Sequence, residues 1–221
     1  MDQNPIKRFD ISDSQAAVNF YEENGFVIVK NFYPAEDLQD FKTEVKNIIN
    51  AHLLKAGIQE MDSTNDDILS NGILALEEKD HEYVAAIYDT IFQSPSFFRI
   101  LGNRNTESYI KDLLDIDSSH ALYGFTNRCR IDPPKDNRRT YGWHQEVFYT
   151  VPRGSYIQTW APLIFVAEGE GGLIGRVTYD PEESYVLCCR VIFNPSLKIS
   201  TIRVSNKFLS YNFTIDPGML P

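Results

Sequence analysis

The sequence predicts an α+β protein in which N-terminal helices pack on a C-terminal half made of strands. Apolar residues recur every three to four positions up to about residue 114, as they do in amphipathic helices. From about Tyr123 they alternate in short runs separated by Pro, Gly and Asn, which is typical of a sandwich or barrel. We therefore expect a single domain over 1–221, with 1–120 mainly helical and 121–221 forming the strands.

The first elements are expected to be a helix, a strand and a second helix. Residues 14–23 have helical spacing, and Gly25 is placed to end this helix as a C-cap glycine. Residues 26–29 are all apolar and predict a short strand. Pro34 begins the second helix, whose apolar positions continue to 53–54.

The middle of the chain is expected to form a surface loop followed by two further helices. Residues 57–72 are acidic and polar, which favours a surface loop. Helical spacing returns over 81–92 and again over 105–114. The histidines at 81 and 120 have no partner at a metal-binding spacing, so we expect them at surface or boundary positions.

The C-terminal half is expected to consist of short strands separated by turns. The alternating or apolar runs lie at 125–131, 156–160, 185–193, 201–204 and 208–213. Clusters of Pro, Gly, Asp and Asn lie between these runs and predict the turns.

Composition excludes several classes of partner. The net charge of −10 and the pI of about 4.9 repel phosphate backbones, so we expect no nucleic acid partner. No apolar run approaches the ~20 residues that cross a bilayer, so we expect no membrane association. The polar N-terminus has no signal-peptide pattern, and three cysteines make no disulfide framework. A cytoplasmic location fits these features best.

The strongest chemical signal is the tetrapeptide Trp-His-Gln-Glu at 143–146, which opens a strand-like run. His144 and Glu146 are two residues apart, so on a strand both side chains point to the same face. One strand can in this way present two of the three ligands of a 2-His-1-carboxylate iron site. An irregular loop with Lys135, Arg138 and Arg139 precedes the motif, as is common for substrate-binding elements.

With this motif and several others, the chain resembles the phytanoyl-CoA dioxygenase-like proteins, which are Fe(II)/2-oxoglutarate-dependent oxygenases. Nearly the whole chain takes part in the resemblance. Residues 20–32 resemble the opening of the family, and 143–146 resemble its Trp-His-Gln-Asp motif, with Glu in place of Asp. The segments 159–163 and 168–173, and Arg-Val-Ser at 203–205, also match family patterns in order and spacing.

The resemblance implies a double-stranded β-helix, or jelly roll, that holds Fe(II) and couples oxidative decarboxylation of 2-oxoglutarate by O₂ to hydroxylation of a small-molecule substrate. By this resemblance, His144 and Glu146 would be iron ligands. Arg203 would pair bidentately with the distal carboxylate of 2-oxoglutarate, and Ser205 would add a hydrogen bond. Trp160 would pack beside this cofactor. The carboxylate of Glu146 favours hydroxylation over halogenation, since related halogenases have Ala or Gly there.

Besides Glu146 in place of Asp, the chain departs from the family at the second histidine. The family has a second histidine between its Gly-Gly turn and its arginine, whereas the last histidine here is His144. Either the native chain carries further residues near 172–175 and 199–201, or the distal ligand has been lost. We favour the first, because both shortened segments fall at loops beside the expected site. An intact mass above 25.4 kDa would support it, and a mass equal to 25.4 kDa would contradict it.

Three functions are therefore compared. The leading hypothesis is the oxygenase. The second is a catalytically inactive jelly roll that binds a ligand or a partner protein and lacks the distal histidine. The third is a cupin-like enzyme of another class, such as an isomerase, which would turn over without 2-oxoglutarate. The fold alone does not separate them.

Overall fold

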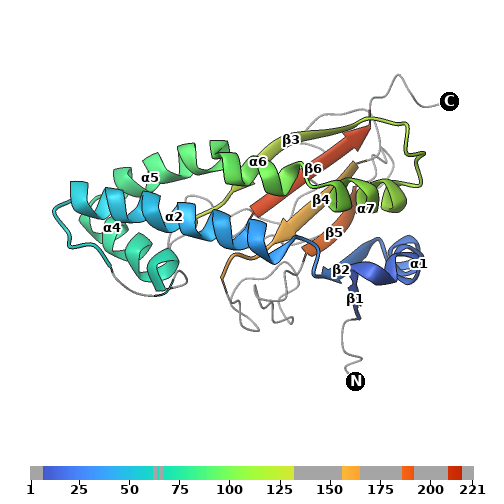
Figure 1. Ribbon diagram of the computed structural model, residues 1–221, viewed down its shortest axis with the longest axis horizontal. Helices are drawn as coiled ribbons and strands as arrows, with labels where there is room; N and C mark the ends of the chain where they lie inside the picture. The colour runs from blue at the N-terminus through green and yellow to red at the C-terminus, as the bar shows by residue number, and fades with distance from the viewer. Residues whose placement is uncertain are drawn as a thin grey trace, which may run out of the picture.

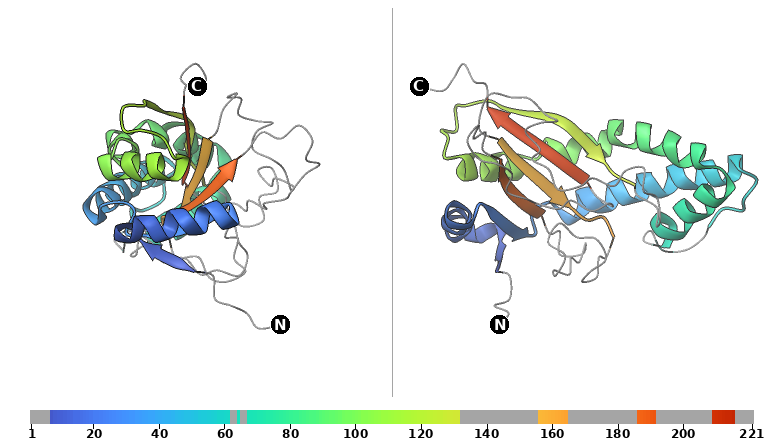
Figure 2. Two further views of the ribbon diagram at one scale, coloured as in Figure 1. Left: turned by 90° about the vertical axis from the view of Figure 1, so that its right-hand side faces the viewer. Right: turned by 180° about the vertical axis from the view of Figure 1, so that it is seen from behind.

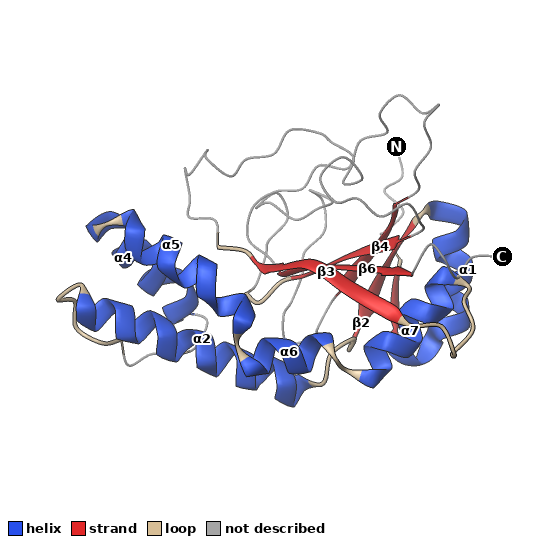
Figure 3. Cartoon of the chain, turned by 90° about the horizontal axis from the view of Figure 1, so that it is seen from above, coloured by secondary structure: helices blue, strands red, loops and turns tan. Residues whose placement is uncertain are grey.

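The computed structural model describes residues 7–61, 64, 67–131, 156–164, 186–191 and 209–215, and these form helices along one face of a six-stranded sheet (Figures 1 and 3). The strands are β1 (Arg8–Asp10), β2 (Phe26–Lys30), β3 (Leu122–Cys129), β4 (Tyr156–Ala161), β5 (Val186–Val191) and β6 (Leu209–Ile215). Their order across the sheet is β1-β2-β5-β4-β6-β3. Only the first pair, β1 with β2, is parallel; the other neighbours are antiparallel.

The N-terminal elements confirm the local predictions. The short 3₁₀ turn η1 (Ile11–Asp13) leads into α1 (Ser14–Asn24), which ends where the amide of Gly25 donates to the Tyr21 carbonyl at 2.8 Å. Gly25 adopts the left-handed conformation, with φ of 76°, which a residue without Cβ reaches at little cost. The chain then turns directly into β2, whose residues Val27 and Val29 face the helices.

The strand β1 is held to the end of β2 by a small polar cluster. The carboxylate of Asp10 accepts hydrogen bonds from the Ser12 amide at 3.0 Å and from the Asn31 side chain at 2.6 Å. The bonds from Ser12 and Asn31 lower the pKa of the Asp10 carboxyl below its ordinary value. Asn31 itself has a positive φ of 54°, a conformation that asparagine tolerates better than most residues.

The long helix α2 (Ala35–Lys55) covers the sheet and extends beyond its end, where α4 (Ile73–Lys79) and α5 (His81–Thr90) pack with it (Figure 1). The predicted surface loop over 57–72 is wrong at its C-terminal end. There the π-helix η2 (Ile68–Gly72) packs on α2, and the Ile68 side chain is fully buried. Apolar residues among the acidic ones thus return this segment to the core.

After α5 the chain passes through η3 (Ile91–Gln93), α6 (Pro95–Leu101) and α7 (Arg104–Leu114). Side-chain caps lie at the starts of α5, α6 and α7. Asp80 accepts from the amide of Glu82, Ser94 from that of Phe97, and Asn103 from those of Asn105 and Thr106. Each cap satisfies amides that have no partner inside the helix. The helix predicted over 105–114 is confirmed as α7, and that over 81–92 as α5 followed by η3.

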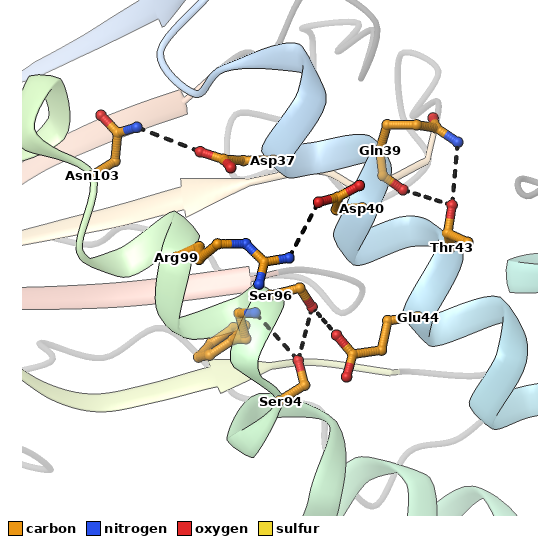
Figure 4. A network of polar contacts seen from close by, with 10 residues as sticks. Asp37, Gln39, Asp40, Thr43, Glu44, Ser94, Ser96, Arg99 and Asn103 are labelled. Carbon is orange, nitrogen blue, oxygen red and sulfur yellow. Dashed lines mark hydrogen bonds and ion pairs between the residues drawn. The ribbon is translucent and has the colours of Figure 1, made fainter.

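A polar seam joins α2 to α6 and the residue that caps α7 (Figure 4). Three acidic residues lie along one side of α2, and each meets a partner across the seam. The pairs are Glu44 with the Ser96 hydroxyl, Asp40 with Arg99 at 3.2 Å, and Asp37 with Asn103 at 3.5 Å. The Ser96 hydroxyl also lies 3.0 Å from that of Ser94. The seam therefore sets the register of the two helices with both buried and exposed contacts.

The sheet contains strands from both halves of the chain, 1–120 and 121–221. Strands β1 and β2 come from the part expected to be mainly helical, 1–120, and β2 pairs with β5 from 121–221. The jelly roll stays a prediction, as does the strand expected at 201–204, which lies outside the described residues. Among the helices that the structure describes, none combines the length and hydropathy needed to cross a membrane.

Candidate functional site

The predicted site residues divide into one that the structure describes and four that it does not. His144, Glu146, Arg203 and Ser205 lie outside the described residues. Trp160 lies on β4, close to the end of the strand. The surroundings of Trp160 are therefore what the structure contributes to the site.

Strand β4 lies inside the sheet, with β5 on one side and β6 on the other, as the view from behind shows (Figure 2). It matches the strand predicted over 156–160 and is one residue longer. Because successive side chains of a strand point to opposite faces, residues 157, 159 and 161 share one face, and 158 and 160 share the other.

The first of these faces packs against the helices. Ile157 and Ala161 belong to the hydrophobic core, together with Val27 and Val29 of β2. Thr159, between the two β4 residues, is fully buried on the same side. This face of the sheet is therefore the floor of the main core, which α2, α6 and α7 cover (Figure 3).

The opposite face also buries side chains. Ile28 is 0% exposed and Trp160 is 3% exposed, yet neither belongs to the core beneath the helices. Both residues are Cα partners of Leu187 on β5, so they lie in one row across three strands. Since neighbouring strands are about 4.8 Å apart, the two Cα atoms are separated by roughly 10 Å. Two buried apolar side chains thus mark a second packed face of the sheet.

Gln158 is the other β4 residue on this second face. It is two residues before Trp160 and only half-buried, whereas its neighbours Ile157 and Thr159 are fully buried. Its Cα partners are Cys189 on β5 and Asn212 on β6. The sequence motifs point to neither Gln158 nor Ile28. The signal that could have found Gln158 is the strand alternation around Trp160.

The three histidines that the structure describes are His52, His81 and His120. The side chain of His81 is 48% exposed and lies 3.2 Å from the carboxylate of Glu82. Burial, and then the charge of Lys55, lower the pKa of His52, whose ring packs edge-on against Tyr83. His120 is at a half-buried boundary position, so the expectation for His81 and His120 is confirmed.

Cys129 lies at the end of β3, beneath the helices, as a free buried thiol. Burial raises its pKa to about 12, so it stays protonated at neutral pH. Among the side chains that the structure describes, no three from His, Cys, Asp and Glu gather in a group that could hold a metal ion.

Neither models of protein families nor the sequences of curated proteins give a match for this chain.

Proposed function

We propose that this chain is a non-haem Fe(II)/2-oxoglutarate-dependent oxygenase that hydroxylates a small molecule in the cytoplasm and releases succinate and CO₂. The fold proposed with it is a jelly roll in which the described sheet is one of two facing layers. The proposal rests on the resemblance of the sequence motifs and on one observation at Trp160.

That observation is the burial of Trp160 on the face of the sheet that points away from the helices. A jelly roll packs two sheets face to face, so one sheet covered by helices must be buried on both faces. Ile28 and Trp160 meet this requirement, because both are buried outside the core beneath the helices. The resemblance gives Trp160 a place beside 2-oxoglutarate, and an indole buried on this face is consistent with that role.

The other roles follow from the chemistry of the side chains. His144 and Glu146 offer an imidazole and a carboxylate two residues apart in the sequence, a donor set suited to Fe(II). Arg203 offers a planar guanidinium for the distal carboxylate of 2-oxoglutarate, with Ser205 two residues further on. Bound Fe(II) supplies the activation of O₂ that decarboxylation of 2-oxoglutarate requires.

A second candidate function is a jelly-roll protein that binds a ligand or a partner without catalysis. The observation that favours it is the set of four histidines, of which none follows His144 in the sequence. Without a distal imidazole, His144 and Glu146 supply only two of the three protein ligands of such an iron site.

The two candidates are separated by an anaerobic titration of Fe(II) and 2-oxoglutarate into the protein, followed by the visible charge-transfer band of the chelate. The oxygenase should develop this band, and His144→Ala should abolish it because the variant loses an iron ligand. The same variant should lose succinate formation under O₂.

The matched control is His81→Ala, which removes an exposed histidine far along the chain from the motif. This variant should keep the full band. A wild-type protein that gives no band at high concentration would leave the binding protein as the better reading. A band that survives in His144→Ala would remove this histidine from the site.

A further inference from the structure

Gln158 does not belong to the hydrophobic core beneath the helices. Its side chain shares the second face of the sheet with Trp160, and the described residues beside it on β4 are buried while it is only half-buried. The second face thus carries a side-chain amide, that of Gln158, beside two buried apolar side chains, those of Ile28 and Trp160.

The distance along the strand relates Gln158 to the ligand expected at Trp160. Two residues of an extended strand span about 6.6 Å, and their side chains stand on the same face. A short dicarboxylate that packs against the Trp160 ring lies within reach of a glutamine side chain at this spacing. Ile28, in the row of Trp160, makes the neighbouring surface apolar.

The chemistry of an amide suits such a ligand. The NH₂ group of glutamine offers two donors and carries no charge, so it can bind a carboxylate or carbonyl oxygen without adding a buried charge. Ligand sites are commonly apolar surfaces with a few placed polar groups that fix orientation.

We propose that Gln158 is a binding residue for 2-oxoglutarate and donates a hydrogen bond from its side-chain amide to an oxygen of the cofactor held beside Trp160. This inference rests on the proposed function and adds a residue to its site. Gln158 orients the cofactor, and the iron ligands and Arg203 keep the roles given above.

The test measures 2-oxoglutarate binding to the Fe(II)-loaded protein by anaerobic calorimetry, with no turnover needed. Gln158→Leu keeps the size of the side chain and removes its donors, so the dissociation constant for 2-oxoglutarate should rise about tenfold. Gln158→Glu keeps the shape but adds a negative charge facing a dianion, so its dissociation constant should rise further. Fe(II) binding without 2-oxoglutarate should be unchanged in both variants.

Gln39→Leu is the matched control, since Gln39 is an exposed glutamine on α2 whose amide donates to Thr43 of the same helix. It should bind 2-oxoglutarate like the wild type. Thermal unfolding without cofactor checks that the Gln158 variants are folded, and their melting temperatures should match that of the wild type. Dissociation constants within twofold of the wild type in both Gln158 variants would overturn this inference and leave the proposed function standing. A wild-type protein that binds no 2-oxoglutarate would overturn both.

Discussion

Position 72 leaves no room for a side chain. A Cβ on Gly72 would lie 2.7 Å from Cγ2 of Ile49, well inside the ordinary contact distance of two carbons. Ile49 is fully buried in the middle of α2, and Gly72 ends the π-helix η2 that packs on it. The glycine is therefore required by close packing of two helical segments, and its backbone conformation is ordinary.

Gly72→Ala should lower the free energy of unfolding by about 1–3 kcal/mol, the usual cost of overpacking a core. Urea unfolding of the variant and the wild type measures this change. The loss should be smaller when the substitution is made in an Ile49→Ala background, because that change removes the contacting methyl group. An equal loss in the two backgrounds would mean that the packing of Ile49 is not the cause.

Trp160 shows what could and could not be predicted for a single residue. Its strand was predictable from the alternation over 156–160, whereas its place beside a cofactor stays a prediction from the resemblance. The burial of its ring on the second face was not predictable, because Trp160 and Ile28 are brought into one row only by pairing of β2 and β4 with β5. Such pairing joins segments far apart in the sequence, and a local pattern contains no information about it.

Between elements, the seam of α2 and α6 combines two kinds of polar contact. Ser96 is 1% exposed and donates to the Glu44 carboxylate, whereas the Arg99–Asp40 ion pair is exposed on both sides. A buried donor that is lost leaves its acceptor without a partner, but an exposed ion pair is readily replaced by water. The buried contact should therefore matter more to the packing of these helices.

Ser96→Ala should lower the free energy of unfolding by about 1–3 kcal/mol, since the Glu44 carboxylate then loses its donor. Arg99→Ala should cost no more than about 1 kcal/mol. Denaturant unfolding of both variants under the same conditions tests the comparison. A larger loss for Arg99→Ala would show that the exposed pair contributes more to the seam.

Local patterns predicted most of the helices and the strand β2. A helical run followed by Gly25 and four apolar residues was enough for α1 and β2, because each signal acts within a few residues. The π-helix η2 escaped prediction, since its apolar residues lie among acidic ones and its packing on α2 is a tertiary contact. The three-residue strand β1 was missed as well, because it is too short for a period to be recognised.

For the whole molecule, the strand order predicts an uneven distribution of stability across the sheet. Strand β4 has a neighbour on each side and buried residues on both faces, whereas β1 is a three-residue strand at one end with β2 as its sheet neighbour. Local opening free energies are usually highest where amides are bonded and buried on all sides.

Hydrogen exchange should therefore be slower for amides of β4 than for those of β1. Mass spectrometry of peptides covering 156–161 and 8–10 measures this, with exchange rates of the unfolded peptides as the reference. Equal protection of the two strands would contradict a sheet in which β4 is central.

The position of β5 between β2 and β4 has a consequence for biosynthesis. The ribosome releases Phe26–Lys30 well before Val186–Val191, the strand that completes its pairing in the sheet. At ordinary elongation rates of 5–20 residues per second, this interval lasts roughly eight to thirty seconds. During that time a strand of sequence Phe-Val-Ile-Val-Lys has an open edge, which is a template for pairing with other chains. The helix α1, made early, packs on this strand during that interval, but the edge that pairs with β5 stays open until translation reaches Val186–Val191.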